Sequence, residues 1–447
     1  MVQQYIQVVF MFTTFVAAHA PDTLWTKTYG GFSYDRCFST VQPTGDGGYI
    51  IGADTESFGM GLEDIWIIKT DSLGDTLWTR LYGGIYRDAC RAIQQTDDSG
   101  YMLVGGTQSF GSGSINMFLM KTDSLGDSLW FKIFDNAHGY TGQQTFDGGF
   151  IIGGSYFRSS QNFYFIKTDA VGDTIWTKEY GGWGEDIIKS IQQTVDSGYI
   201  ITGRTESYGA GDDDIWLIKT DKHGDSLWSK TYGGSSWDYS SYVNCTSDGG
   251  YVITGRTNSF CVGGSDVWLL KTNASGDTLW TRTFGGTGTE GGRYVQETSD
   301  GGFVIVGFTN SYGAGGYDAW IIKTNANGDS LWTQTYGGLY FDACYGGLQL
   351  IDNSYIFSGH TQSWGVGLSD VWLVKTEPDT LGINEMISIP KTLYLIAPTI
   401  LSDISVLQAN NQIFDITGRL VNRDEIKSGI YFLFNDSYFV QKIIILK

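Results

Sequence analysis

Short runs of aromatic and β-branched residues alternate along this chain with turns rich in Asp, Ser and Gly. In one stretch, IIKSIQQT at 187–194 precedes the turn Asp196-Ser197-Gly198, which YIITG at 199–203 follows. IWLIK at 215–219 and LWSKT at 227–231 come next, with the turn DKHG between them. Such runs bounded by such turns predict antiparallel hairpins. We expect four strands here, named A to D in chain order.

This four-strand pattern recurs with a period close to 52 residues. The same point of strand D carries a tryptophan seven times, at Trp25, Trp78, Trp130, Trp176, Trp228, Trp280 and Trp332. Four antiparallel strands repeated at this spacing are typical of the blades of a β-propeller.

The strand count predicts how the ring closes. Strand C occurs seven times, the last at 371–375, and no strand D follows it. A strand D at 24–28 instead precedes the first strand A. We expect this N-terminal strand to complete the last blade, because a paired edge cannot template aggregation. The sequence therefore predicts an all-β protein with a seven-bladed β-propeller over residues 21–379, closed by the N-terminal strand.

Both ends of the chain differ from the repeats. Residues 1–20 form an apolar run that ends in small residues, which is typical of a cleaved signal peptide. No other run is long and apolar enough to span a bilayer, so we expect no transmembrane span. After residue 379 the repeats stop: 380–395 is expected to be a linker, and 396–447 a small β-sandwich-like module.

The C-terminal module carries the motifs FDITGRLV at 414–421, SGIYF at 428–432 and KIIIL at 442–446. In this order they resemble the C-terminal sorting domain of the type IX secretion system. The resemblance implies that the type IX machinery is a partner. It also implies a protein that is secreted, or held at the outer-membrane surface of a Gram-negative-type bacterium.

The repeats carry DGGYI at 46–50 and GDTLWTRLYGG at 74–84. They resemble uncharacterised bacterial propeller repeats and, more loosely, kelch-type and quinoprotein-type propellers. This likeness implies the fold, and the function has to be argued from a site.

Charge and cysteine content limit which partners and which disulfide bonds we expect. The chain has 48 acidic and 28 basic residues and a net charge of −20, so we expect no nucleic-acid partner. Three of the five cysteines, Cys37, Cys90 and Cys344, occupy the same place in three repeats. Buried apolar thiols are the favoured interpretation, and a Cys37–Cys344 bridge is the alternative.

Two rings of polar residues recur in all seven repeats and a third in six of them, and we expect all three to be structural. Amides lie on strand A at Gln42, Gln94, Gln143, Gln192, Asn244, Gln296 and Gln349. Strand C opens with Asp64, Asn116, Asn162, Asp214, Asp266, Asp318 and Asp370. Strand A opens with Asp35, Asp88, Asp186, Asp238, Glu290 and Asp342. This last ring could attract Ca²⁺, but we expect it to cap backbone N–H groups and predict no cofactor.

The candidate site lies on the face formed by the B–C and D–A loops, such as SYGAGDDD at 207–214 and GGWGED at 181–186. These loops are long and aromatic, whereas the A–B and C–D turns are tight. One position near the end of strand B varies among the repeats and supplies the candidates Asp54, Arg204, Arg256 and His360. Arg204 and Arg256 belong to adjacent blades and could hold a carboxylate or sulfate. Trp183, Trp237 and Trp364 lie in loops of the same face and could stack on sugar rings, or pack between blades.

Evidence for an enzyme is thin. The chain has four His residues and neither an HExxH nor a GxSxG motif, so we predict no catalytic residue and no metal ligand. We expect a non-enzymatic binding platform for a glycan or protein at the cell surface. A polysaccharide hydrolase or lyase and a structural surface-layer component are the alternatives. The third repeat, shortened to a spacing of 46, is either decayed or specialised for binding.

Overall fold

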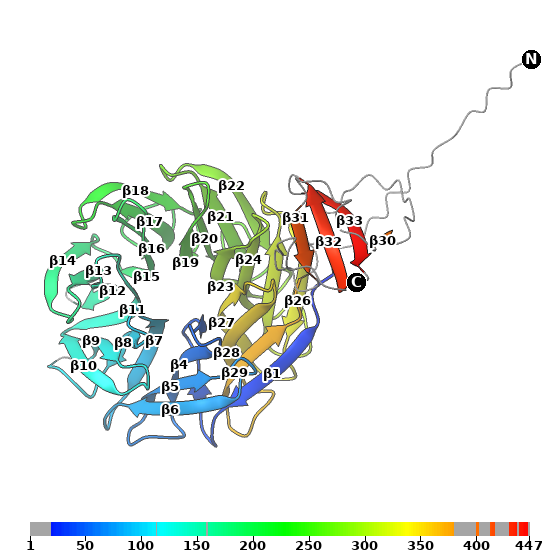
Figure 1. Cartoon of the computed structure of the whole chain (residues 1–447). Helices are drawn as coiled ribbons and strands as arrows, with labels where there is room; N and C mark the ends of the chain where they lie inside the picture. Colours follow the sequence, from blue (N-terminus) through cyan, green and yellow to red (C-terminus); the bar gives the residue numbers. More distant parts are fainter. Residues whose placement is uncertain are drawn as a thin grey trace, which may run out of the picture. The chain divides into compact units, whose positions relative to one another are not determined.

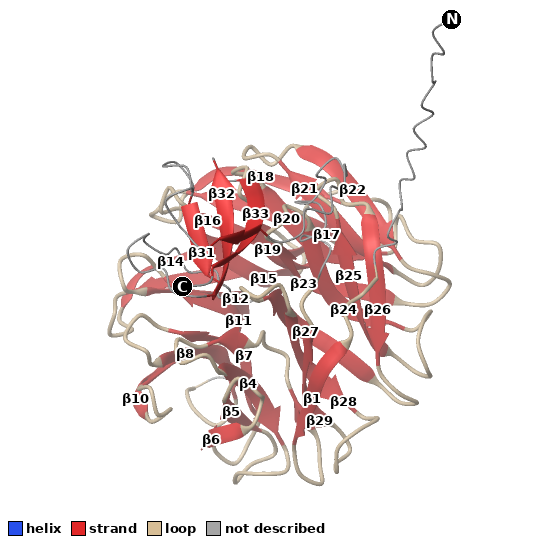
Figure 2. Ribbon diagram, turned by 45° about the vertical axis from the view of Figure 1, so that its right-hand side comes forward, coloured by secondary structure: helices blue, strands red, loops and turns tan. Residues whose placement is uncertain are grey.

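The computed structural model describes residues 19–379, except 113 and 158–159, and four strands between 399 and 445. The chain divides into two compact units, 1–383 and 384–447. Every described element is a strand, so the all-β prediction is confirmed (Figure 2). The predicted signal peptide, apart from residues 19–20, and the predicted linker lie outside the described residues. No described helix is long and apolar enough to cross a membrane.

The first unit is a ring of seven β-sheets around a central channel, with strand A of each blade innermost (Figure 1). Blade 1 contains β2 (Asp35–Arg36), β3 (Gln42–Pro43), β4 (Tyr49–Thr55), β5 (Asp64–Thr70) and β6 (Thr76–Tyr82). Blade 2 contains β7 (Asp88–Gln95), β8 (Tyr101–Thr107), β9 (Asn116–Thr122) and β10 (Ser128–Phe134). Blade 3 contains β11 (Ala137–Gln144), β12 (Phe150–Phe157), β13 (Gln161–Thr168) and β14 (Thr174–Tyr180). Blade 4 contains β15 (Asp186–Gln193), β16 (Tyr199–Thr205), β17 (Asp214–Thr220) and β18 (Ser226–Tyr232).

The remaining three blades follow the same order. Blade 5 contains β19 (Asp238–Cys245), β20 (Tyr251–Thr257), β21 (Asp266–Thr272) and β22 (Thr278–Phe284). Blade 6 contains β23 (Glu290–Glu297), β24 (Phe303–Thr309), β25 (Asp318–Thr324) and β26 (Ser330–Tyr336). Blade 7 contains β27 (Asp342–Gln349), β28 (Tyr355–Thr361), β29 (Asp370–Thr376) and β1 (Thr23–Tyr29). The seven-bladed prediction is therefore confirmed.

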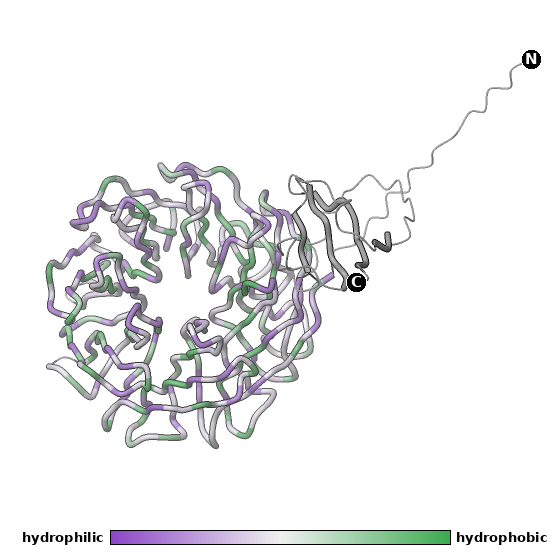
Figure 3. Tube along the Cα trace, in the orientation of Figure 1, coloured by the Kyte–Doolittle hydropathy of each residue, from purple (hydrophilic) through white to green (hydrophobic). Residues whose placement is uncertain are grey.

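The core lies between the blades, because both faces of each middle strand are covered by neighbouring sheets. In β4 and β5 every residue is buried, whereas β6 on the outer rim alternates between exposed and half-buried residues. One core cluster joins Ile67 of blade 1 to Leu103 and Phe118 of blade 2. Hydrophobic and hydrophilic stretches accordingly alternate along every blade (Figure 3).

The N-terminal strand closes the ring, as predicted. β1 pairs antiparallel with β29, with Thr26 opposite Val374 and Thr28 opposite Trp372. The indole of Trp372 also donates a hydrogen bond to Thr26 Oγ1 at 2.6 Å. Residues almost 350 positions apart in the sequence thus share one sheet.

The rims of adjacent blades are joined by a repeated pair of contacts. Tyr29 donates its hydroxyl hydrogen to the carbonyl of Gly74 in the next C–D turn at 2.6 Å. Lys27 pairs with Asp75 of the same turn at 2.7 Å, and Lys132 pairs in the same way with Asp173. These exposed ion pairs contribute little individually, but they recur around the rim.

Members of all three rings make hydrogen bonds within the fold, although one buried carboxylate oxygen each of Asp214, Asp266 and Asp370 in the strand-C ring has no partner among the described residues. Asp35 accepts hydrogen bonds from Gly31 N at 2.7 Å and from Ser57 Oγ at 2.6 Å, and so fixes the D–A loop to the B–C loop. Asp64 accepts one from Met60 N at 2.9 Å within its B–C loop. Gln94 Oε1 accepts one from Gln144 N of the next blade at 2.8 Å. These oxygens are occupied by internal donors.

The cysteines and the shortened third repeat are the two departures from the regular repeat that the structure describes. All five cysteines are free thiols, and Cys37, Cys90 and Cys344 are buried, so the apolar interpretation holds and the Cys37–Cys344 bridge is absent. Blade 3 is a complete four-stranded sheet despite its shorter spacing. Ala137 begins its strand A, where other blades have the buried acid.

The second unit is described through four strands: β30 (Thr399–Leu401), β31 (Gln412–Asp415), β32 (Gly429–Asn435) and β33 (Tyr438–Ile445). They form one sheet in the order β30-β33-β32-β31, in which β30 and β33 are parallel. The predicted strand-rich run at 428–447 is therefore a hairpin of β32 and β33.

Ring closure makes a testable prediction. A truncated chain that starts at Gly30 lacks β1 and leaves the edge of β29 unpaired, so we expect a lower melting temperature and concentration-dependent aggregation. A chain that starts at His19 retains β1 and is the matched control. Thermal unfolding followed by circular dichroism, with size-exclusion chromatography, compares the two. Equal melting temperatures would show that β1 is dispensable for closure.

Candidate functional site

The innermost strand of blades 2 to 7 carries a β-bulge at the same position, and the identity of the bulged residue differs from blade to blade. In β15, for example, Ile188 pairs with Gly203 and Ser190 with Thr202, so Lys189 has no partner on β16. A bulge leaves its extra residue unpaired and changes the direction of its side chain. The bulged residues of blades 2 to 7 are Arg91, Tyr140, Lys189, Ser241, Arg293 and Tyr345. In blade 1, Phe38 lies in the gap between β2 and β3.

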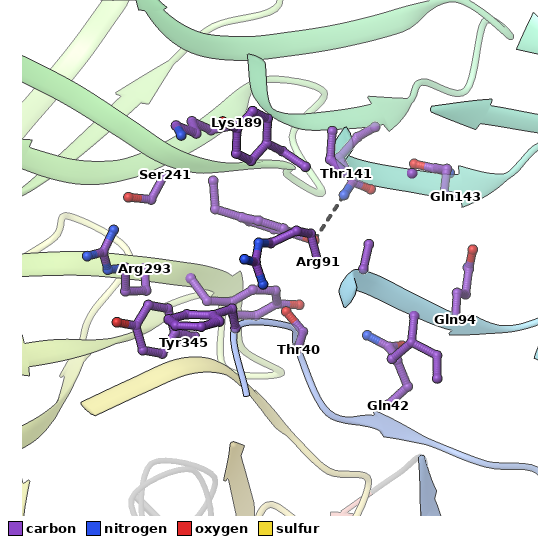
Figure 4. Close-up of a pocket in the computed structure, with 18 of the residues that line it drawn as sticks. Thr40, Gln42, Arg91, Gln94, Thr141, Gln143, Lys189, Ser241, Arg293 and Tyr345 are labelled. Atoms are coloured by element: carbon purple, nitrogen blue, oxygen red, sulfur yellow. Dashed lines mark hydrogen bonds between the residues drawn. The ribbon is translucent and has the colours of Figure 1, made fainter. Parts of the chain in front are cut away.

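These seven residues line two cavities in the central channel. The mouth cavity, of about 630 Å³, lies toward the B–C and D–A loops and also involves Arg204, Tyr239 and Arg256. The inner cavity, of about 310 Å³, continues to the amide ring at Gln94 and Gln143 (Figure 4). The predicted face therefore contains a recess, and the recess lies in the channel.

Cations and aromatic rings alternate around the bulge ring. The Arg91 guanidinium lies 4.8 Å from the centre of the Phe38 ring, and Lys189 Nζ lies 4.1 Å from that of Tyr140. The Arg293 guanidinium lies 5.1 Å from the Tyr345 ring. Each cation thus rests on an aromatic ring of a neighbouring blade, a favourable cation–π arrangement.

Ser241 is the small member of the bulge ring. It lies between Lys189 and Arg293 in the close-up view (Figure 4). The wall beside Arg293 is formed by Gly291 and Gly292, which add no side chain to the mouth cavity. The mouth cavity therefore has free space between Lys189 and Arg293.

Two of the cations at the mouth cavity have carboxylate partners. Arg91 Nη1 lies 2.5 Å from Asp54 Oδ2, and Asp54 Oδ1 accepts a hydrogen bond from Cys90 N at 2.6 Å. Arg204 pairs with Glu185 at 2.7 Å and with Asp213 at 2.8 Å. Their charges are therefore largely balanced within the protein.

Lys189 and Arg293 lack such balance in the described part of the chain. Burial and, to a smaller extent, the nearby charges of Arg204, Arg293 and Arg91 together lower the pKa of Lys189 to about 8. Burial also lowers the pKa of Arg293, and Arg256 adds to this effect. Both shifts report an environment that disfavours positive charge.

The predicted residues near the end of strand B have different roles. Arg204 and Arg256 do come together: their guanidinium groups lie 5.9 and 4.8 Å from the Tyr239 ring, at the mouth cavity. Asp54 is buried and orients Arg91. His360 is also buried, stacked on Phe341 and Tyr345, and burial lowers its pKa to about 4.

The three predicted tryptophans are not among the residues that line the channel cavities. Trp183 is fully exposed and Trp237 is half exposed on their loops. Trp364 packs on Trp372 with ring centres 5.1 Å apart, an arrangement that Phe58 and Trp66 repeat in blade 1. Trp364 thus contacts a tryptophan of its own blade, and both alternatives, stacking on a sugar ring and packing between blades, stay predictions.

Sequence reasoning missed the bulge ring. The signal was present, because the fourth residue of strand A differs among the repeats while the amide near the end of the strand recurs. Strict alternation does not reveal a bulge, so these residues were not assigned to the channel. Among the described residues, no three His, Cys, Asp or Glu side chains converge as metal ligands.

Comparisons with known proteins add little beyond the fold. No family model matches the chain, and no curated protein matches it. A protein of unknown function from Dyadobacter fermentans matches with a TM-score of 0.44 and 11% identity over 80% of this chain and 98% of that one. The Pan2 WD40 domain from Neurospora crassa matches with a TM-score of 0.47 and 9% identity, over 78% and 97%. Quinohemoprotein alcohol dehydrogenase from Comamonas testosteroni matches with 0.43 and 9%, over 79% and 76%.

The Asp54–Arg91 pair makes the second prediction. Replacing Asp54 with Ala leaves Arg91 and Cys90 N–H without their acceptor in a buried place, and we expect a loss of about 3 kcal/mol in unfolding free energy. Asp75→Ala, which breaks the exposed pair with Lys27, is the control and should cost less than about 1 kcal/mol. Urea unfolding measures both. Equal losses would contradict the assigned role of Asp54.

The crowding of cations makes the third prediction. Arg293→Gln removes a like charge close to Lys189, so the pKa of Lys189 should rise above about 8. Arg282→Gln, which removes an arginine paired with Asp329 on the outer rim, should leave it unchanged. NMR titration of isotopically methylated lysines measures the shift. An unchanged pKa in Arg293→Gln would mean that the charge of Arg293 does not contribute to the pKa of Lys189.

Proposed function

We propose that this protein is an exported, non-enzymatic binding platform that recognises a glycan or a protein at a bacterial cell surface. The observation that carries the proposal is the bulge ring. Positions that repeat serve the fold, whereas the variable strand-A position gathers seven side chains around one recess. A recess with aromatic walls and a few polar groups is the usual form of a ligand site.

The mouth cavity suits recognition in its composition as well as its shape. It presents the rings of Tyr140, Tyr239 and Tyr345 together with the hydroxyl of Ser241. Aromatic rings with polar edges offer contact area to a ligand and a hydrogen bond at the rim. The ligand would enter through the face of the B–C and D–A loops.

Export is the second part of the proposal. It is supported by the signal-like residues 1–20 and by the resemblance of 396–447 to a type IX sorting domain. We place the mature protein outside the cell or on the outer-membrane surface, with the type IX secretion machinery as its transport partner. The sorting module then acts as the targeting signal for secretion, and the propeller carries the binding function.

The fourth prediction tests the binding function by filling the recess with a larger side chain. Ser241→Trp adds a large ring between Lys189 and Arg293 and removes no charge, so it should abolish binding of any ligand that enters the recess. Ser72→Trp adds the same ring to an exposed C–D turn and is the control. Full-length protein is titrated by calorimetry against surface polysaccharides and acidic proteins.

A saturating ligand at about a hundred times its Kd should also raise the unfolding free energy by about 2.7 kcal/mol. Binding that persists in Ser241→Trp would move the site elsewhere. Release of new reducing or unsaturated ends during the titration would favour the hydrolase or lyase. Concentration-dependent assembly without any ligand would favour the surface-layer component.

A further inference from the structure

The channel mouth is positive although the chain is acidic. The whole sequence has 48 acidic and 28 basic residues. The residues that line the mouth cavity include Arg91, Lys189, Arg204, Arg256 and Arg293, and among these described lining residues there is no Asp or Glu. A charge distribution opposite to that of the chain points to a local role for the cations.

Three of these cations are unbalanced. Asp54 neutralises Arg91, and Glu185 and Asp213 neutralise Arg204. In the part of the chain that the structure describes, no carboxylate lies within ion-pair distance of Lys189, Arg256 or Arg293. Lys189, Arg256 and Arg293 are therefore the described cations of the mouth cavity that have no carboxylate partner, whereas Arg204 has three, Glu185, Glu206 and Asp213.

Arg293 also has an unused donor. Its Nε is fully buried and has no hydrogen-bond partner among the described residues. The flat face of its guanidinium is occupied, because the rings of Phe308 and Tyr345 each lie 5.1 Å from it. Stacking on both rings holds the guanidinium in place at the wall of the mouth cavity.

The arrangement is costly without a ligand. Partly buried like charges repel one another, and a buried donor without an acceptor loses its hydration. An oxyanion between Lys189 and Arg293, above Ser241, would relieve the repulsion and accept charge-assisted hydrogen bonds. Arg256 lies at the rim of the mouth cavity, stacked on Tyr239. There it would face the same anion, or the anionic group of the next sugar in a polysaccharide.

The uncharged walls indicate what carries the oxyanion. Tyr140, Tyr239 and Tyr345 offer aromatic faces with hydroxyl edges, and Ser240 and Ser241 add further hydroxyls. Hydrogen-bonding hydroxyls beside aromatic faces suit a sugar, whose C–H faces stack and whose hydroxyls pair. An acidic peptide would need backbone partners, whereas the groups aimed at the cavity are mostly side chains.

We propose that the mouth cavity is an anion site in which Lys189, Arg256 and Arg293, arranged around Ser241, bind the carboxylate or sulfate group of an acidic saccharide. This inference rests on the proposed binding function and specifies its ligand. Arg91 and Arg204 are paired with carboxylates of the protein. They contribute to the electrostatic potential of the cavity without contacting the anion directly.

The test compares three short oligosaccharides of equal length, one of uronic acids, one sulfated and one neutral. Each is titrated by calorimetry into the full-length protein at neutral pH. The uronate, the sulfated oligomer or both should bind, and the neutral oligomer should bind at least tenfold more weakly. Affinity should fall as salt is added, because the contact is ionic. The relative affinity of the two acidic probes identifies the anion.

Charge-removing variants locate the site. Lys189→Met and Arg293→Met should each weaken the acidic oligomer about tenfold to a hundredfold, the range for a charged hydrogen bond. Arg293→Lys should recover part of the loss. Lys178→Met, which removes a rim lysine paired with Asp225, is the matched control and should bind as the unaltered protein does.

Stability without ligand gives an independent measurement. Since Lys189 and Arg293 repel each other, Arg293→Met should melt at a higher temperature than the unaltered protein, whereas most substitutions of partly buried residues destabilise. A lower melting temperature together with unchanged binding would overturn the proposal.

The affinity should also depend on pH with a defined sign. The charged and titratable groups near Lys189 are Arg91, Arg204, Arg293 and His138, with Tyr140 beneath it; burial lowers the pKa of His138 to about 3, so it stays neutral in this range. Below pH 8 the amine is protonated, so affinity should be constant there. Above pH 8 it loses its proton, and affinity should fall by up to about tenfold per pH unit. Lys189→Met should lack this fall.

Other outcomes separate the two proposals. Equal binding of neutral and acidic oligomers, unaffected by Arg293→Met, would overturn the anion site and leave the binding platform standing. Tighter binding of an acidic peptide than of any saccharide would overturn the saccharide assignment. Absence of binding to every probe, in a protein that melts cooperatively, would count against both.

Discussion

Closure of the ring by β1 is the constraint on which the rest of the structure depends. Strands B and C of each blade are buried on both faces, so every sheet needs a neighbour on each side. The cluster that joins Cys37 and Trp66 of blade 1 to Leu373 of blade 7 forms across the closing seam. An open chain of blades would expose two such faces and one long strand edge, both of which are costly in water. Closure also creates the channel, because seven strands A then face one axis.

The placement of charge follows from the same geometry. Acidic residues are distributed among buried loop caps such as Asp35 and rim pairs such as Lys27 with Asp75. In both places a hydrogen-bond donor or a cation of the same propeller contacts the carboxylate. The channel is different, because Lys189 and Arg293 are brought toward a common axis from separate blades. Neither belongs to a repeated pair, so their proximity is a property of the closed ring.

The β-bulge explains how a repeated fold can carry a specific site. A bulged residue has no partner on strand B, and its side chain leaves the packed interface between blades. Its identity can therefore change from Arg to Tyr or Ser at little cost to the blade. The neighbouring amides cannot change so freely, because Gln94 and Gln143 bond to the next blade. Variation is thus concentrated at the channel, where it serves recognition.

The sequence by itself determined the architecture. Turn chemistry, the tryptophan period and the strand count predicted four strands per blade, seven blades and closure by 24–28, because these signals are local or repetitive. It also identified Arg204 and Arg256, which meet at the mouth cavity as expected for adjacent blades. The tertiary structure decided the rest of the site. Whether Asp54 faces a ligand or holds Arg91 depends on packing between blades 1 and 2, and the contact of Trp364 with Trp372 depends on packing within blade 7. The assembly of Lys189, Ser241 and Arg293 around one recess depends on the bulges, which the repeat spacing does not reveal, and on the way the closed ring brings three blades to one axis.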